Sequence, residues 1–372
     1  MTILGAGSGA YAAAVDLKLR GFDVQLCSTF EPDADSKIKP LQREGGIHYT
    51  GALGEGFQQV RATMDPSIIR DSELVMIITL ANGYEHYALT CAHLFHDGQF
   101  IFLTPGYIGG SLRFLKLIGE QGDTAGGGNG NHSGRVRICE TNNLAYISRQ
   151  TGPTEVRIFR KSKFLQLGTL PSKYAGEAFD VVKDVYPFLV PVDSVLESGM
   201  LNPNIVLHPA GMVMNAGWIE ASHGGFRYYS EGCTRAVARV MESFEEERVA
   251  VCNALGIKTM MFLDYYKKAG YTSEEATGIY EALRASEPNR ELMAPSSLDH
   301  RYLTEDVGYG LVPMKAISEI SGVPVPTMSS LVHLSSAMTG INFEVTGLNS
   351  EKMGLHGVTV QGLNQILRDG FS

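Results

Sequence analysis

The chain has 372 residues, of which 44% are hydrophobic and 19% charged, and its formal net charge at pH 7 is -9. This length exceeds one ordinary hydrophobic core and predicts two domains. The acidic balance argues against nucleic acid or an anionic membrane as the main partner, and no apolar run reaches the ~20 residues that span a bilayer. The five cysteines show no CxxC spacing, so neither a zinc site nor a disulfide framework is indicated, and a reducing, cytoplasmic setting is expected.

The first residues predict a strand, a glycine-rich turn and a helix. Residues 2–4 are apolar, residues 5–10 read GAGSGA, and a helix-forming run follows that ends near Gly21. In this GxGxxA spacing, Gly5 permits a sharp turn, Gly7 lets a pyrophosphate approach the backbone, and Ala10 lets the helix pack closely on the strand. An ordinary strand-to-helix turn is the alternative. The expected cofactor contacts are Gly5, Gly7, Ser8, Gly9 and Ala10.

The second strand, residues 23–27, bears on the choice of dinucleotide. A carboxylate about 20 residues after the glycines would bind the ribose 2'-hydroxyl of NAD and repel the 2'-phosphate of NADP. Ser28 and Thr29 stand there instead, with Glu31 and Asp33 later in the chain. Both cofactors therefore stay open, and the two hydroxyls weakly favour NADPH over NADH. A solvated loop explains the segment equally well.

Further apolar strands are expected at residues 58–63, 72–80 and 99–103, separated by helix-length segments. This alternation is typical of a parallel sheet covered on both faces, in which ligands lie beyond the carboxyl ends of the strands. The segments 79–82 and 104–110 are therefore expected on the nicotinamide side of the cofactor site, unless they are plain connecting loops. The residues predicted to line it are Thr79, Leu80, Pro105 and Gly106.

The glycine-rich run at residues 122–134 lacks the closing Lys-Ser/Thr of a phosphate-binding P-loop, so a flexible surface loop with a solvated His132 is expected. Strands are predicted at residues 135–139, 154–160, 164–170 and 188–192, with a helix at 172–185. Pro191, within residues 188–192, favours an edge position in the sheet.

From about residue 204 the pattern is helical. Residues 233–255 form a long amphipathic pattern that Gly256 ends, and further helices are expected at 258–269, 273–285 with Ser273 as cap, 311–321 and 327–339. The sequence thus predicts an α/β N-terminal Rossmann-like domain, residues 1–192, plus an all-α C-terminal domain, residues 193–372.

Hydride transfer to a C=O or C=N bond needs a proton donor at the substrate, and histidine titrates in the useful range. His208 differs from the other histidines because it precedes Pro209 at the start of the helical region, where proline suits a first helical turn. A buried structural histidine is the commoner case. Asp306 lies between a polar loop and an apolar helix, so it is either the N-cap of that helix or the partner of a distant histidine.

Four motifs together resemble the opine dehydrogenase family, of the octopine dehydrogenase type. They are the GAGSGA turn, Glu140-Thr141-Asn142-Asn143-Leu144, Asn202-Pro203-Asn204 leading to His208-Pro209, and the run from Arg301 to Val312. Two features depart from the family pattern: Gly308 stands where proline is expected, and the 122–134 run is unfamiliar. These departures leave the choice of substrate open.

The resemblance implies a reductive condensation, in which an L-amino acid and an α-keto acid, often pyruvate, form an imine that NADH or NADPH reduces. It implies His208 as acid and base, Asp306 as the carboxylate that orients it, and Glu140, Thr141 and Asn142 as residues near the substrate. No metal is expected, and a homodimer is possible.

Three other interpretations stay open. A simple 2-keto acid reductase would need no amine, and a related dehydrogenase with lysine as proton donor would rely on Lys163 or Lys267. A redox-sensing protein would hold a dinucleotide without turnover, which the intact pair of His208 and Asp306 disfavours, although a fold alone does not establish a function.

Overall fold

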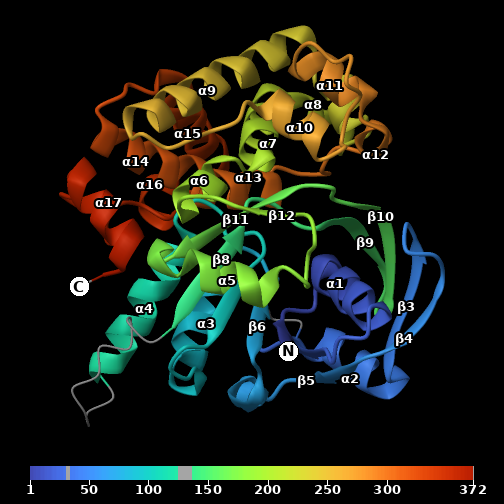
Figure 1. Cartoon of the computed structure of the whole chain (residues 1–372). Helices are drawn as coiled ribbons and strands as arrows, with labels where there is room; N and C mark the ends of the chain where they lie inside the picture. Colours follow the sequence, from blue (N-terminus) through green and yellow to red (C-terminus); the bar gives the residue numbers. More distant parts are fainter. Residues whose placement is uncertain (31–33, 125–135, 372) are drawn as a thin grey trace. The chain divides into compact units, whose positions relative to one another are not determined.

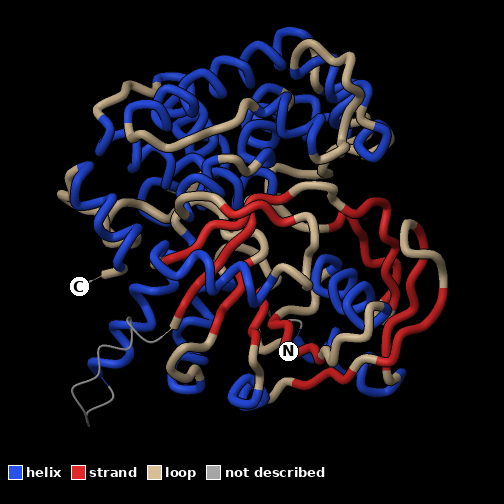
Figure 2. Tube along the Cα trace, viewed as in Figure 1, coloured by secondary structure: helices blue, strands red, loops and turns tan. Residues whose placement is uncertain are grey.

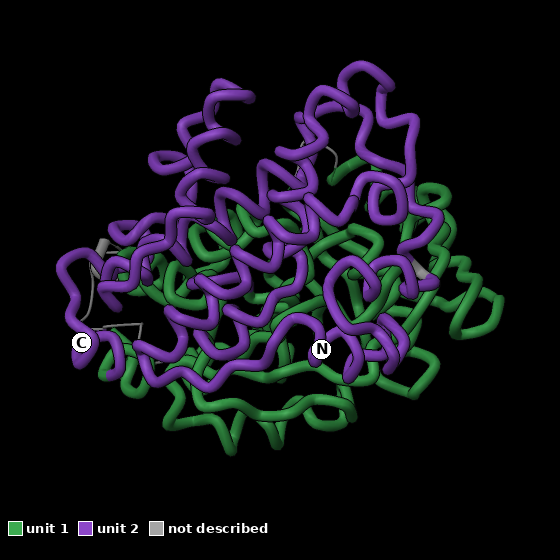
Figure 3. Tube along the Cα trace, turned by 90° about the horizontal axis from the view of Figure 1, so that it is seen from above, with its two compact units in different colours: residues 1–106, 110–195, 365–372 green, residues 107–109, 196–364 purple. Residues whose placement is uncertain are grey.

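The computed structural model describes residues 1–30, 34–124 and 136–371. The chain forms two compact units (Figure 3): unit 1 is Met1–Gly106, Gly110–Val195 and Gln365–Ser372, and unit 2 is Tyr107–Gly109 and Leu196–Asn364. The sequence placed the change of domain at residue 192 and assigned everything after it to the helical part. The C-terminal residues belong to unit 1 instead, where Asp369 lies 3.8 Å from Lys173.

Unit 1 is built on an eight-stranded sheet (Figure 2) with the order β12-β11-β8-β7-β6-β1-β2-β5. Its strands are β1 (Thr2–Leu4), β2 (Gln25–Cys27), β5 (Arg61–Thr63), β6 (Leu74–Ile77), β7 (Phe100–Leu103), β8 (Arg137–Thr141), β11 (Leu165–Leu170) and β12 (Leu189–Pro191). All neighbours pair in parallel except β8 and β11. The central strands are buried on both faces, so they read as unbroken apolar runs.

The order β5-β2-β1-β6-β7-β8 is that of a doubly wound dinucleotide-binding sheet. The strand order reverses between β1 and β6, and ligands of such sheets bind where the order reverses, beyond the carboxyl ends of the strands. The prediction of an α/β Rossmann-like unit is confirmed, and β12 lies at the sheet edge, as Pro191 indicated.

A second sheet, of four strands, is absent from the sequence prediction. Its order is β4-β3-β10-β9, and its strands are β3 (Gly46–Gly51), β4 (Gly56–Gln59), β9 (Tyr146–Gly152) and β10 (Glu155–Lys161). The single strand predicted at residues 58–63 is wrong, because the chain crosses at Val60 from β4 in this sheet to β5 in the larger one.

The helices of unit 1 are α1 (Ser8–Leu19), α2 (Ala34–Glu44), α3 (Gly83–Cys91), α4 (Gly110–Thr124) and α5 (Ala175–Val182). The helix predicted at residues 172–185 is shorter than expected, since a 3₁₀ turn, Ser172–Tyr174, precedes α5. Residues 122–124 complete α4, and the rest of the glycine-rich run, with His132, lies outside the described residues.

Helix α1 contacts strands of both sheets (Figure 1) and is buried from Gly9 to Leu17. This explains its apolar, alanine-rich sequence, because a helix without a polar face has to be covered all round. Its one buried carboxylate, Asp16, accepts hydrogen bonds from Tyr146 of β9 at 2.7 Å and from Lys161 of β10 at 2.9 Å. The two bonds tie α1 to the smaller sheet.

Unit 2 is helical, as predicted. From Val195 onward the helices are α6 (Val195–Met200), α7 (Pro203–Met214), α8 (Ala216–Ser222), α9 (Arg235–Ala254), α10 (Phe262–Lys268), α11 (Ile279–Ala285), α12 (Glu287–Arg290), α13 (Arg301–Asp306), α14 (Val312–Ser321), α15 (Pro326–Thr339), α16 (Phe343–Thr346) and α17 (Val360–Asp369). Helix α17 begins in unit 2 and ends in unit 1, which resumes at Gln365. In the part of the chain that the structure describes, no helix is both long and apolar enough to cross a membrane.

Two helix boundaries differ from the prediction. Helix α10 begins later than residue 258, and α11 begins after Gly278, so Ser273 caps no helix. Helix α9 does end as predicted, because Gly256 adopts a positive φ of 69° that suits glycine.

The glycine turn after β1 depends on Gly5. Its φ is +133°, and a Cβ atom there would lie 2.1 Å from the carbonyl oxygen of Ile78. Gly7 differs: it is the N-cap of α1 with an ordinary φ of -82°, and a Cβ atom there would meet nothing within 4 Å. The fold therefore requires glycine at residue 5 and tolerates a side chain at residue 7.

We expect Gly5→Ala to lower the free energy of unfolding by about 2 kcal/mol or more, since it combines a strained backbone with an overlap on Ile78. Gly7→Ala serves as the matched control and is expected to cost about 1 kcal/mol or less. Urea unfolding of the two variants checks the difference, and equal losses would contradict this account of the turn.

Candidate active site

His208 lies in the middle of α7, which corrects the prediction that Pro209 marks a helix start. The helix begins earlier because Asn202 is its N-cap, accepting a hydrogen bond from the Asn204 N–H at 3.0 Å, and Pro203 occupies the first turn. Pro209 is an internal helix residue. Both His208 and Pro209 are buried among the apolar residues of α7.

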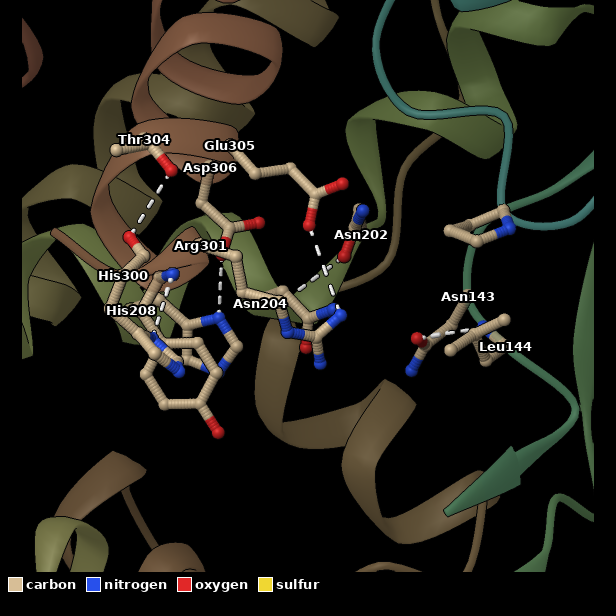
Figure 4. A network of polar contacts seen from close by, with 12 residues as sticks. Asn143, Leu144, Asn202, Asn204, His208, His300, Arg301, Thr304, Glu305 and Asp306 are labelled. Atoms are coloured by element: carbon tan, nitrogen blue, oxygen red, sulfur yellow. Dashed lines mark hydrogen bonds and ion pairs between the residues drawn. The ribbon is translucent and has the colours of Figure 1, made fainter. Parts of the chain in front are cut away.

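The structure brings His208 and Asp306 together although they are 98 residues apart (Figure 4). The imidazole Nδ1 lies 2.7 Å from Asp306 Oδ2, and the two residues are 4% and 2% exposed. Asp306 is the last residue of α13, and its side chain makes no capping hydrogen bond to the π-helical turn Val307–Leu311 that follows. The loop predicted before it is in fact helical from Arg301, with the His300 ring as cap.

Three tyrosines that the sequence did not indicate surround His208. The Tyr229 hydroxyl lies 2.8 Å from Nε2, and the Tyr302 ring stacks on the imidazole with centroids 3.6 Å apart and an interplanar angle of 12°. Tyr228 donates to the backbone carbonyl of His208 at 2.8 Å. The sequence shows that Tyr228 and Tyr229 are adjacent, but no local pattern relates any of the three tyrosines to a histidine in another element.

Burial controls the protonation of the pair. It raises the pKa of Asp306 to about 8 against the opposing charge of Arg301, and it lowers the pKa of His208 well below its ordinary value, with Arg301 acting in the same direction. Asp306 Oδ1 is also buried without a hydrogen-bond partner among the described residues, which disfavours the ionised form. Because the two groups share a hydrogen bond, they titrate as a pair that keeps one exchangeable proton up to about pH 8.

Arg301, which the sequence reasoning did not single out, supplies positive charge near this pair. Its side chain is 48% exposed, and its Nη1 lies 3.9 Å from Glu305 Oε2 one turn along α13 (Figure 4). Its charge acts on the pKa of both His208 and Asp306. A half-exposed guanidinium beside a buried acid–base pair is suited to bind a carboxylate ligand.

In unit 1, the predicted phosphate contacts Ser8, Gly9 and Ala10 form the first turn of α1, and no side chain caps it. This arrangement fits a pyrophosphate, because the first N–H groups of a helix have no partner within the helix and its dipole favours an anion. Gly7 adds no side chain that would obstruct the approach.

Ser28 and Thr29 follow β2, where the adenosine ribose was expected. Ser28 is 2% exposed and donates to the Phe30 carbonyl at 3.3 Å, while Thr29 Oγ1 lies 3.0 Å from His86 Nε2. His86 had no signal in the sequence, and burial lowers its pKa. Glu31 and Asp33 lie outside the described residues.

The predicted nicotinamide contacts lie at the carboxyl ends of two neighbouring strands. Thr79 and Leu80 follow β6, and Pro105 and Gly106 follow β7, which pairs with β6 in parallel. Gly106 packs against the Glu140 side chain so closely that a Cβ atom would lie 2.2 Å from its carboxyl carbon.

Glu140, Thr141 and Asn142, at and after the end of β8, are fully buried. Glu140 accepts a hydrogen bond from Ser111, and Thr141 donates to the Asn143 carbonyl at 2.8 Å. The Asn142 side-chain oxygen accepts from the Gln166 backbone N–H at 2.9 Å, a contact that links β8 to β11. Within the described ranges, no three His, Cys, Asp or Glu side chains are grouped to hold a metal ion.

Asp306 should make stability depend on pH. Its pKa in the folded protein, about 8, exceeds the usual ~3.9 of an unfolded chain, so its favourable contribution is complete below pH ~3.9 and is lost as the pH rises through 8. Between pH 6.5 and 8, we expect this group to lower the free energy of unfolding by roughly 1.4 kcal/mol per pH unit. Urea unfolding of wild type and Asp306→Asn at both pH values measures the difference, and parallel pH dependences would refute it.

Comparisons with known proteins agree with this architecture. The family model for the α-helical domain of NAD/NADP octopine/nopaline dehydrogenases matches residues 191–339. Two solved structures of octopine dehydrogenase, one with NADH and L-arginine and one with NADH and pyruvate, have TM-scores of 0.73 and 0.70; each is 18% identical and covers 99% of this chain and 97% of that chain. Yersinopine dehydrogenase with NADP⁺ bound has a TM-score of 0.74, is 14% identical, and covers 95% of this chain and 96% of that chain.

A curated relative shows the family. The opine dehydrogenase of Arthrobacter sp. (strain 1C) is 31% identical over 363 residues, which are 97% of this chain and 96% of that protein. The resemblance noted from the sequence motifs is thus confirmed. The chain belongs to the opine dehydrogenase family of NAD(P)-dependent oxidoreductases.

Proposed function

We propose that this protein condenses an L-amino acid with an α-keto acid such as pyruvate and reduces the resulting imine with NADH or NADPH. The observation that carries the proposal is the buried pair of His208 and Asp306, which holds an exchangeable proton at neutral pH. The ligands of the octopine and yersinopine dehydrogenase structures support an amino acid, a keto acid and either dinucleotide as the reactants.

The start of α1 would hold the dinucleotide through the N–H groups of Ser8, Gly9 and Ala10. When bound, the nicotinamide supplies the hydride for the reduction. Thr79, Leu80, Pro105 and Gly106, at the carboxyl ends of β6 and β7, would lie on its nicotinamide side, which follows the rule for ligands of doubly wound sheets.

His208 and Asp306 would act as one acid–base unit. In the reductive direction the pair gives its proton to the hydroxyl of the amine–keto acid adduct. The C–O bond then breaks and water departs. The C=N bond that forms can accept the hydride. Asp306 holds Nδ1 and so stabilises the charged imidazole whenever it forms. In the oxidative direction the pair takes a proton back.

Arg301 would position the substrates. Both an amino acid and an α-keto acid carry a carboxylate, and a guanidinium binds a carboxylate through two parallel hydrogen bonds. The position of Arg301 on the same helix as Asp306 supports this role, since a carboxylate held there lies near the acid–base pair. Glu140 and Thr141 remain proposed as substrate contacts, and Asn142 less so because its side-chain oxygen is engaged with Gln166.

A substrate panel tests the proposal. With NADH or NADPH, pyruvate and a set of L-amino acids, the purified protein should consume cofactor only when both organic substrates are present. Consumption with pyruvate alone would indicate a simple 2-keto acid reductase. Tight cofactor binding without turnover on any combination would indicate a redox-sensing protein.

The proton donor is tested in the same assay with His208→Gln, which we expect to lower kcat by roughly 10²- to 10⁴-fold. Dinucleotide binding, followed by nicotinamide fluorescence, should be retained because His208 belongs to unit 2 and the glycine turn to unit 1. A nearly unchanged rate would point to a lysine such as Lys163 or Lys267 as the donor.

The preference for NADPH remains a proposal. It is supported by Ser28 and Thr29, which place hydroxyls after β2 where a carboxylate would favour NADH. We expect Thr29→Asp to lower kcat/KM for NADPH at least tenfold relative to NADH, about 1.4 kcal/mol, because a carboxylate repels the 2'-phosphate. Thr29→Asn, of the same shape without the charge, is the control. An unchanged NADPH/NADH ratio in the aspartate variant would argue against a ribose site at this strand end.

We also propose a cytoplasmic location, which the five buried, free cysteines support. The homodimer stays a prediction.

A further inference from the structure

We infer that His86 makes the choice of cofactor depend on pH, because its protonated ring favours the 2'-phosphate of NADPH through the hydroxyl of Thr29. The inference rests on the proposed function, since it concerns the ribose end of the dinucleotide site proposed there. In NADP-binding sheets of this kind, an arginine near the end of the second strand accommodates the 2'-phosphate. In this chain the side chain that contacts Thr29 is a histidine, and Thr29 Oγ1 lies 3.0 Å from His86 Nε2.

The contact between Thr29 and His86 joins the segments that follow two different strands of the larger sheet. Thr29 follows β2, and His86 lies near the start of α3, the helix after β6. Strands β2 and β6 flank β1, whose carboxyl end leads into the glycine turn and α1. The dinucleotide of such a sheet binds beyond these strand ends, with its ribose at the end of β2. His86 therefore belongs to the part of unit 1 where the 2'-substituent is expected.

Thr29 provides the hydroxyl after β2 that a ligand can reach. The preceding residue, Ser28, is 2% exposed, and its hydroxyl donates to the Phe30 carbonyl at 3.3 Å. Thr29 and His86 are both half-buried. The rings of Phe30 and Tyr87 pack around the imidazole, each with its centroid 5.3 Å from that of His86. This packing holds the imidazole against Thr29 and leaves it partly open to solvent.

The protonation of His86 decides whether Thr29 accepts or donates a hydrogen bond toward a ligand. A neutral imidazole can accept from Thr29 at Nε2, which leaves the Thr29 oxygen to accept from the 2'-hydroxyl of NADH. The imidazolium has a proton on both nitrogens, so Nε2 donates to Thr29, and Thr29 donates onward. A doubly ionised phosphate offers acceptor oxygens without a donor, and positive charge attracts it. The protonated form of His86 therefore favours NADPH.

The described neighbours of His86 place no net charge beside it. The adjacent acid on α3, Glu85, is bound to Arg113 of α4 at 3.1 Å, so these two side chains balance each other. Tyr87 is neutral, because burial raises its pKa above the ordinary value. Burial lowers the pKa of His86, and no charged group among the described residues adds to that shift. A 2'-phosphate held by Thr29 would raise this pKa, and by reciprocity protonation of His86 strengthens the binding of the phosphate.

Equilibrium binding of NADP⁺ and NAD⁺ tests the inference without turnover, because the two dinucleotides differ only in the 2'-phosphate. For the wild-type protein, we expect the Kd of NAD⁺ divided by that of NADP⁺ to rise roughly threefold from pH 8 to pH 6.5, at which the 2'-phosphate is still mostly doubly ionised. In His86→Gln the ratio should be lower and independent of pH. In His86→Lys, which stays charged over this range, the ratio should be high and equally independent of pH. Isothermal calorimetry measures each Kd.

His93→Gln is the matched control, because His93 is exposed in the 3₁₀ turn Ala92–Leu94 directly after α3. It should reproduce the wild-type rise in the ratio. A ratio that stays constant with pH in the wild type, or that rises equally in His86→Gln, would overturn the inference. If His86→Gln fails to fold by circular dichroism, the comparison of wild type with His86→Lys decides, and an equal rise in these two would overturn it.

The outcomes separate this inference from the proposed function. A wild-type protein that binds neither dinucleotide would overturn both. The expected pH dependence of binding together with no turnover on the substrate panel would overturn the proposed function alone. Turnover on that panel with a pH-independent binding ratio would overturn this inference alone.

Discussion

The side chains of His208 and Asp306 share a hydrogen bond that is buried away from water in unit 2. Burial makes the ionised form of each group costly, so the pair keeps a proton that either group alone would exchange at a very different pH. Helices α9, α10, α13 and α15 all contact α7 and contribute to that burial. The protonation state of the site is therefore a property of the whole helical packing.

Each of the two units contains a buried helix that is apolar all round and that carries residues of the candidate site. In unit 1 it is α1, whose first turn has no side-chain cap and whose body is buried from Gly9 to Leu17. In unit 2 it is α7, buried almost throughout, with His208 as its one ionisable side chain. A buried helix is held by packing along its full length, which orients its functional end or side chain without help from a mobile loop.

The sequence predicted those elements whose conformation depends on residues close together in the chain. The glycine turn, the unbroken apolar strands and the long helix α9 all follow from neighbouring residues, and the structure contains each of them. The smaller sheet escaped prediction because it pairs Tyr49 of β3 with Val156 of β10, a contact between distant segments. For the same reason spacing alone left the partner of Asp306 open, and Tyr229 and Arg301 were missed. Pro209 gave a wrong helix start, because Asn202 and Pro203 begin the helix at an earlier point in the chain.

The alanine-rich surface of α1 has a consequence for how this fold can be altered. Since α1 has no polar face, the β4-β3-β10-β9 sheet covers one side of the hydrophobic core that includes Ala13 of α1 and Val156 of β10. Removing that sheet would expose an apolar side of α1 to water and leave Asp16 without its partners Tyr146 and Lys161. A chain shortened to the eight-stranded sheet and its helices would therefore lack part of its hydrophobic core. A glycine turn transferred to another protein together with α1 would need the four-stranded sheet as well, because that sheet covers α1.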